Sequence, residues 1–277
     1  MTKMQVLAPA KINLSLRVLG KRPDGFHEIE TLLSPISLFD KIDIEKQSRW
    51  IDFGCDDPTL STGDDNLVVR AAKLFFERTK VKSGVSIKLQ KTVPHGAGLG
   101  GGSSDAAATL KALNQLFETK LPREELVKIG SSIGSDVSVF LFESAAICKG
   151  RGDIVEPTQL KNKLSILLLK PDFGVATAWA YSRWKESKEI PRVPRAPQKL
   201  GQLIFVNDLE RPVFEKFVFL AQLKTWLLKQ KEVAAALMTG SGSTVFAVLR
   251  ENADGDRLAQ RSSELDLKLW TCGCQTI

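Results

Sequence analysis

Side chains that could carry out phosphoryl chemistry stand at three places in this chain of 277 residues. In APAKINLSLRVLG, Lys11 and Asn13 are two residues apart, and they are predicted to share one face of a strand that follows a Pro-Ala turn. In PDGFHEIETL, the turn-forming Pro-Asp-Gly presents Phe26 and His27. In SIGSDVSVF, Asp136 follows a Gly-Ser turn, where a buried carboxylate is costly unless it is paired. Phosphoryl transfer needs cationic charge near the phosphates and an acid–base carboxylate, and these segments supply both.

Each of these residues also has an ordinary structural explanation. Lys11 fits a surface lysine, His27 a histidine satisfied at the end of a strand, and Asp136 a helix cap. Serine hydrolysis is a poorer candidate chemistry, because the two histidines, His27 and His95, are not accompanied by a GxSxG nucleophile elbow. Taken one at a time, the three segments therefore leave the structural explanations open.

A glycine-rich segment, PHGAGLGGGSSDAA at residues 94–107, could bind a phosphate. Glycines let backbone N–H groups approach an anion closely, and the start of the following helix adds unpaired N–H groups and a positive dipole end. The preceding VSIKLQK alternates apolar and polar residues as a strand does, and a helix is predicted from about Ser103 with Ser103, Ser104 and Asp105 as caps. The segment therefore predicts a strand, a phosphate-binding loop and a helix.

Two common nucleotide motifs do not fit this loop. A Walker motif ends in Gly-Lys-Ser/Thr, and this loop has no lysine. Gly96, Gly98 and Gly101 satisfy GxGxxG, but the acidic residue that a dinucleotide fold needs after a second strand is missing, since Glu118 ends a helical segment instead. A purely structural turn would need fewer glycines and serines than stand here. A different phosphate-binding fold is therefore predicted.

Composition narrows the class of protein. The net charge of +7 and the pI near 9.2 suit an anionic partner, but the basic residues are scattered and not interleaved with aromatics, so nucleic acid is not expected. No apolar run approaches the roughly 20 residues of a membrane span, and the first residues resemble no signal or transit segment, so we expect a cytoplasmic protein without a membrane partner. The four cysteines have no CxxC spacing, and Cys272 and Cys274 lack the further ligands of a zinc site.

Runs of predicted strands followed by predicted helices favour an α+β fold. The chain length suggests two domains, and the mixed Gly, Pro and charged segment Gly150–Lys163 is the expected boundary. We therefore predict an N-terminal domain at residues 1–155 and a C-terminal domain at residues 156–277. The second domain contains another glycine turn, TGSGS at residues 239–243, which could be a hairpin turn or a close approach to a ligand.

The order and wording of these segments resemble the GHMP kinase superfamily over almost the whole chain. The landmarks are PAKINLSL, PDGFHEI, PHGAGLGGGSSDAA, GSDVSVF and TGSGSTVF. The first two resemble those members that phosphorylate the 2-hydroxyl of a cytidine-diphosphate methylerythritol in non-mevalonate isoprenoid biosynthesis. The resemblance implies an α+β fold of two domains, the first binding ATP and the second on the substrate side, with the active site in a cleft between them.

The resemblance also implies roles for individual residues. It makes Asp136 the carboxylate that orients or deprotonates the attacking hydroxyl and Lys11 its cationic partner. ATP and Mg²⁺ are the implied cofactors, with Ser104 as a metal or phosphate contact. The implied substrate ligands are Asn13, Phe26, His27 and Tyr181, with Trp179 as the alternative aromatic, and His27 would bind the cytosine edge. The implied ATP-binding residues are Asn66, Pro94, Gly96, Gly98, Leu99, Gly100, Gly101, Gly102, Ser103 and Ser104.

The sequence departs from the family pattern at two of these segments. Phe26 stands where a tyrosine is common, which keeps a ring face for stacking but loses the hydroxyl, and Ser138 stands where a proline usually follows Asp-Val. Two alternatives stay open: a kinase of the same superfamily for another small alcohol, such as homoserine or mevalonate, and a nucleotide sensor without catalysis. The presence of both Lys11 and Asp136 argues against the sensor.

Overall fold

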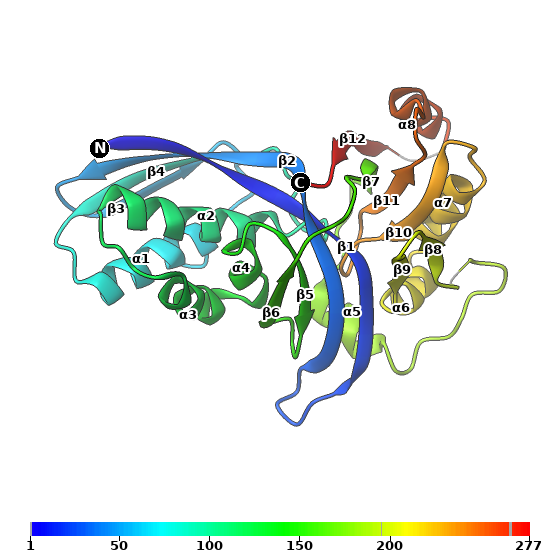
Figure 1. Cartoon of the computed structure of the whole chain (residues 1–277), viewed down its shortest axis with the longest axis horizontal. Helices are drawn as coiled ribbons and strands as arrows, with labels where there is room; N and C mark the ends of the chain where they lie inside the picture. The colour runs from blue at the N-terminus through cyan, green and yellow to red at the C-terminus, as the bar shows by residue number, and fades with distance from the viewer. Residues whose placement is uncertain (1, 195, 266–267) are drawn as a thin grey trace. The chain divides into compact units, whose positions relative to one another are not determined.

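A computed structural model describes residues 2–194, 196–265 and 268–277 of the chain (Figure 1). The chain separates into two compact units, and each is assembled from several segments. Unit 1 comprises the chain up to Ala10, Leu38–Pro94 and Gly100–Ser144, and unit 2 comprises Lys11–Ser37, His95–Leu99 and the chain from Ala145 onward. Mixed helix and sheet in both units confirms the α+β class.

Two long strands, β1 (Lys3–Lys21) and β2 (His27–Gln47), contribute residues to both units. The predicted Pro-Ala turn before Lys11 is wrong, because Pro9 and Ala10 lie inside β1. A proline fixes φ at a value compatible with extended backbone and removes only one N–H group, so it need not end a strand.

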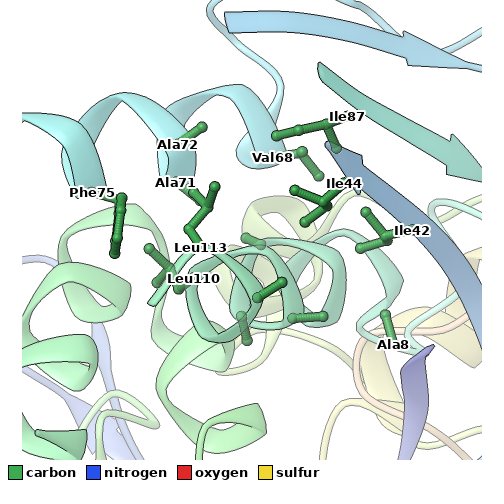
Figure 2. Close-up of a cluster of buried hydrophobic side chains, with 14 of the residues drawn as sticks. Ala8, Ile42, Ile44, Val68, Ala71, Ala72, Phe75, Ile87, Leu110 and Leu113 are labelled. Atoms are coloured by element: carbon green, nitrogen blue, oxygen red, sulfur yellow. The ribbon is translucent and has the colours of Figure 1, made fainter. Parts of the chain in front are cut away.

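The sheet of unit 1 has the order β3-β4-β2-β1, and helices cover one of its faces (Figure 1). β2 and β4 are antiparallel, with Ile42 opposite Leu89 and Ile44 opposite Ile87. These side chains pack against the apolar faces of α1 and α2, where Phe75 and Leu110 are buried (Figure 2). The remaining elements of this unit are β3 (Ile51–Cys55), α1 (Leu67–Thr79), β4 (Gly84–Gln90), α2 (Gly101–Leu116), α3 (Arg123–Ile133) and α4 (Ser135–Phe140).

Unit 2 contains strands of two sheets, the first of which is the eight-stranded sheet that also includes β3-β4-β2-β1. In the first, β2 pairs with β5 and β1 pairs in parallel with β9. The second is an antiparallel sheet with the order β10-β11-β7-β12, on which α7 and α8 pack. The elements are β5 (Ala145–Lys149), β6 (Ile154–Thr158), β7 (Ser165–Pro171), α5 (Thr177–Arg183), β8 (Gln198–Leu200), β9 (Leu203–Asn207), α6 (Glu210–Lys216), α7 (Val218–Leu228), β10 (Val233–Met238), β11 (Val245–Leu249), α8 (Gly255–Ser262) and β12 (Leu269–Gln275).

The segment that the sequence marks as a domain boundary, Gly150–Lys163, contains β6, which forms a hairpin with β5. Among the described residues, no helix combines the length and the apolar character that crossing a membrane requires.

Candidate functional site

The glycine loop has backbone conformations that other residues rarely adopt. Gly96, Gly98 and Gly100 have φ values of 62°, 75° and 72°. Left-handed residues at every second position turn successive N–H groups toward one side, which is the geometry of anion-binding nests. A side chain at Gly98 would also meet the backbone of Thr239, so this glycine serves both the turn and a close backbone approach.

Helix α2 begins at Gly101, two residues earlier than the sequence predicts, and Gly100 is its N-cap residue. No side chain caps the helix, so the predicted capping roles of Ser103, Ser104 and Asp105 are wrong. The left-handed Gly100 lets the chain enter the helix directly, and this leaves the first-turn N–H groups without side-chain partners. The hydroxyl of Ser104 is buried and has no hydrogen-bond partner. The N–H groups at the helix start suit a phosphate oxygen, and the unpartnered hydroxyl of Ser104 is able to donate to a phosphate or to ligate a cation.

Lys11 is buried, with only 5% of the residue exposed. Its ammonium donates hydrogen bonds to Asn13 Oδ1 at 2.7 Å and to the carbonyl oxygen of Gly98 at 2.9 Å. Its backbone N–H also donates to the carbonyl of Leu99. The lysine is therefore fixed to the glycine loop by both its backbone and its side chain, which a surface lysine would not be.

The amide of Asn13 is held in one orientation. Its Nδ2 donates to Thr31 Oγ1 at 2.8 Å, which leaves Oδ1 to accept from Lys11. Thr31 in turn donates to the carbonyl of Ser15. The structure thus brings Lys11 and Asn13 together as the strand spacing predicts, and it adds Thr31, which no motif singled out.

The second glycine turn packs directly on the first. Thr239 Oγ1 accepts from the backbone N–H of Asn13 at 3.0 Å and lies 3.3 Å from both Asn13 Oδ1 and the carbonyl of Gly98. A Cβ on Gly98 would lie 2.3 Å from the carbonyl oxygen of Thr239. Thr239 therefore shares both acceptors with the ammonium of Lys11. The TGSGS motif marked this turn in the sequence, but the sequence alone assigned no role to Thr239.

His27 and Tyr181 lie side by side, with ring centroids 5.3 Å apart. Trp184, at the end of α5, packs edge-on to His27 at 6.1 Å, a contact that the sequence did not predict. Trp179 packs edge-on against Phe217. Burial lowers the pKa of His27, and the charge of Lys21 adds to this effect, so the neutral imidazole is favoured.

Phe26 is exposed, and its ring lies beneath the guanidinium of Arg151 at 5.0 Å. The exposed ring remains available for stacking, while Arg151 adds a cation next to it.

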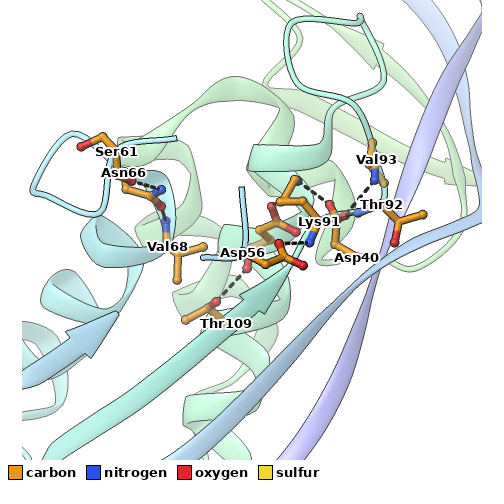
Figure 3. Close-up of polar contacts among 10 residues, drawn as sticks. Asp40, Asp56, Ser61, Asn66, Val68, Lys91, Thr92, Val93 and Thr109 are labelled. Carbon is orange, nitrogen blue, oxygen red and sulfur yellow. Dashed lines mark hydrogen bonds and ion pairs between the residues drawn. The ribbon is translucent and has the colours of Figure 1, made fainter. Parts of the chain in front are cut away.

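Two more of the predicted residues belong to unit 1. Asn66 caps α1 by accepting from Val68 N at 2.9 Å, and its Nδ2 donates to the carbonyl of Ser61 (Figure 3). Asp136 lies in the first turn of α4, where the N-cap residue is Gly134. It is therefore not the helix cap that the structural explanation proposed.

Ser138, which replaces a common proline, is buried in α4 and its Oγ lies 2.8 Å from Ser131 Oγ of α3. In place of the proline ring that is common in the family, Ser138 thus provides a hydroxyl that forms a hydrogen bond between α3 and α4. No group of three or more His, Cys, Asp or Glu residues suited to a metal ion occurs in the described part of the chain.

Two family models match the chain. The GHMP kinases N terminal domain matches residues 66–144, which include the glycine loop and Asp136, and the GHMP kinases C terminal model matches residues 188–264. Solved structures agree with this assignment. A crystal structure of 4-(cytidine 5'-diphospho)-2C-methyl-D-erythritol kinase superposes with a TM-score of 0.82 at 33% identity, covering 99% of this chain and 100% of that one. A homoserine kinase from Cytophaga hutchinsonii has the same fold, with a TM-score of 0.69 at 17% identity over 100% of this chain and 95% of that one.

Curated relatives agree over most of their length. The 4-diphosphocytidyl-2-C-methyl-D-erythritol kinase of Methylacidiphilum infernorum is 43% identical over 87% of this chain and 84% of the relative. The enzyme of the same name from Bacillus cytotoxicus is 38% identical over 92% of this chain and 91% of the relative. The chain therefore belongs to the 4-diphosphocytidyl-2-C-methyl-D-erythritol kinase family of the GHMP kinases.

Proposed function

We propose that this protein transfers the γ-phosphoryl group of ATP to the 2-hydroxyl of 4-diphosphocytidyl-2-C-methyl-D-erythritol, a step of non-mevalonate isoprenoid biosynthesis. The names of its relatives support the substrate. The observation that carries the proposal is the buried Lys11, whose ammonium is held at the glycine loop by Asn13 and Gly98. A fixed buried cation beside a glycine loop is suited to a phosphate chain and to the charge that develops during transfer.

In this proposal the substrate hydroxyl attacks the γ-phosphorus while the bond to the β,γ-bridging oxygen breaks and ADP leaves. Asp136 orients the hydroxyl and accepts its proton, and Lys11 neutralises charge on the transferring group. Because such transition states are loose, positioning and charge neutralisation supply most of the catalysis. The pairing of Lys11 with Asp136 is part of the proposal.

ATP would be held by the loop residues Pro94–Ser104 and by Asn66. The buried hydroxyl of Ser104 has no protein partner, which fits it to a phosphate oxygen or to Mg²⁺. When bound, Mg²⁺ would neutralise charge on the phosphates. This assignment places ATP binding mainly in residues 1–155 and the opposite side of the substrate site in residues 156–277.

The cytidine end of the substrate would be bound by Phe26, His27 and Tyr181, with Asn13 nearer to the reacting hydroxyl. Two neighbouring rings and one exposed ring offer stacking surfaces, and the neutral imidazole that burial favours can both donate and accept a hydrogen bond. Trp184 joins this group, while Trp179 is the weaker candidate because it packs against Phe217.

The test is substrate-dependent ADP release by the purified protein with ATP and Mg²⁺. We expect turnover with 4-diphosphocytidyl-2-C-methyl-D-erythritol and none with homoserine or mevalonate. Turnover with either of the latter two alone would overturn the proposed substrate, and ATP binding without turnover of any alcohol would favour the nucleotide sensor.

The variant Asp136→Asn tests the catalytic carboxylate. We expect turnover to fall by at least about 1000-fold while ATP affinity stays within a few-fold, because the carboxylate acts in the transition state. Activity equal to that of the unchanged protein would contradict the role of Asp136.

A further inference from the structure

Three charged side chains are buried together in unit 1 and have no part in the proposed chemistry. The ammonium of Lys91 lies 2.5 Å from Asp40 Oδ2 and 2.9 Å from Asp105 Oδ2. The exposed fractions of the three side chains are 7%, 0% and 2%. Burying three charges is costly, and a hydrophobic cluster would stabilise the fold at least as well, so their retention calls for another explanation.

Asp40 holds the chain where it leaves β4 for the glycine loop. Its Oδ1 accepts from the backbone N–H groups of Thr92 at 2.6 Å and Val93 at 2.8 Å, while Oδ2 accepts from Lys91 (Figure 3). The backbone N–H of Lys91 donates to Asp56 Oδ1 at 2.8 Å. The backbone N–H groups of three consecutive residues, Lys91, Thr92 and Val93, are therefore each held by a carboxylate at the entry to the loop.

Asp105 holds the other end of the loop. It lies on α2, one turn after the first helical residue, Gly101. A Cβ on Gly101 would lie 3.2 Å from Lys91 Nζ and 3.0 Å from Val93 Cγ1, so the start of α2 packs tightly on Lys91. Lys91 thus joins Asp40 and the loop entry to Asp105 and the loop exit.

The negative charges of Asp40 and Asp105 explain why the residue between them, Lys91, must be a cation. Burial raises the pKa of Asp105 to about 7 although Lys91 opposes the shift, and the carboxylate of Asp40 adds to it. Burial works against the charge of Lys91, but Asp105 and Asp40 outweigh it and raise the pKa of Lys91. Without the ammonium, two carboxylates would face each other below the helix end that is proposed to bind phosphate.

We infer that Lys91 is a positioning residue for the nucleotide: through Asp40 and Asp105 it fixes both ends of the glycine loop, so that the N–H groups of the loop are preorganised for the ATP phosphates. This inference rests on the proposed assignment of the loop to ATP. Preorganisation lowers the ordering cost of binding, so the effect belongs to nucleotide affinity and not to the attack of the alcohol.

The test compares Lys91→Met with Lys88→Met, which removes an exposed lysine from β4, the strand that ends just before Lys91. Binding of a non-hydrolysable ATP analogue is measured by calorimetry without any alcohol, and kcat and KM are measured separately. For Lys91→Met we expect the Kd of the analogue and the KM for ATP to rise by about tenfold to a hundredfold, the range for loss of a buried charged hydrogen bond, while kcat at saturating ATP changes by less than about threefold. Lys88→Met is expected to bind as the unchanged protein does, and Lys91→Arg to recover part of the affinity.

Asp105→Ala provides a second variant. Lys91 and Asp40 remain in this variant as an ion pair with no net charge, so the buried charge stays balanced. The substitution cuts the link to α2 and is expected to weaken ATP binding in the same direction. Folded Lys91→Met and Asp105→Ala proteins with unchanged Kd, or with a loss confined to kcat, would overturn the inference. The binding measurement needs no alcohol. If the proposed alcohol substrate is wrong, the ADP-release assay will reveal it, and the effect of Lys91 on nucleotide affinity is still measured.

Discussion

At the scale of single residues, burial of charge is the common feature of this protein's polar sites. Lys11 is tolerated inside the fold because two fixed oxygens accept from it, and Thr239 holds the same two oxygens. Lys91 is tolerated because two carboxylates flank it. In both cases removing one partner would leave a buried charge unsatisfied, which costs more than the net gain of forming the pair.

Asp105 supplies a pH prediction at this scale. Its pKa is raised from 3.8 to about 7 in the folded protein, chiefly by burial. Between these values the unfolded chain releases the proton while the folded chain keeps it, so this group's contribution to stability is lost as the pH rises toward 7. Asp105→Asn cannot titrate, and its free energy of unfolding relative to the unchanged protein should therefore increase from pH 5 to pH 8, by on the order of 2–3 kcal/mol.

Urea denaturation of both proteins at the two pH values measures this difference. An equal difference at pH 5 and pH 8 would mean that Asp105 titrates near its ordinary pKa in the folded state.

At the scale of elements, the two glycine turns form one interlocked feature of unit 2. Thr244 N donates to the carbonyl of Ala97, Gly242 and Gly240 have positive φ, and Gly98 meets the backbone of Thr239. Close backbone packing of this kind cannot relax by moving a side chain. The loop is therefore only as well placed as the turn after β10 that supports it.

Gly98→Ala tests this packing against Gly201→Ala, since both glycines have positive φ but a Cβ on Gly201 meets nothing within 4 Å. Both variants carry the left-handed strain of about 1–2 kcal/mol. We expect Gly98→Ala to lose about 1–3 kcal/mol more, from overpacking, and to lower kcat/KM by more than about tenfold, because small displacements of catalytic groups are costly.

Thermal unfolding and ADP release measure the two effects. Similar stability and activity in both alanine variants would show that the two turns do not need their close contact.

At the scale of the whole molecule, the chain enters each compact unit more than once, through β1, β2 and the glycine loop. Residues proposed for ATP and for the substrate are consequently drawn from segments far apart in the sequence. Ligand binding should then stabilise the fold as a whole, because a ligand that binds only the folded state adds to its free energy of unfolding.

ATP with Mg²⁺ at about 100 times Kd should therefore add about 2.7 kcal/mol to the free energy of unfolding. The same increase is expected for Asp136→Asn, since that carboxylate is proposed to act in the transition state. Chemical denaturation with and without nucleotide measures both, and an Asp136→Asn protein that ATP fails to stabilise would assign Asp136 to nucleotide binding.

Much of the fold could be predicted from local patterns. The alternation in VSIKLQK corresponds to β4, and the helix predicted after the glycine loop corresponds to α2. The errors lie where two local signals compete. Proline at Pro9 suggested a turn inside a continuous strand, and serines suggested caps where the left-handed Gly100 starts the helix.

The sequence by itself determined the family, the α+β class, the glycine loop that is proposed to bind phosphate and the proximity of Lys11 to Asn13, because motifs and strand periodicity are local properties of the chain. Only the tertiary structure decided that Thr239 shares the acceptors of Lys11, that Tyr181 and not Trp179 lies beside His27, and that Lys91 joins Asp40 to Asp105. These contacts join residues between 14 and 226 positions apart. Their partners are chosen by packing and by the need to neutralise buried charge, and neither leaves a periodic signal in the sequence.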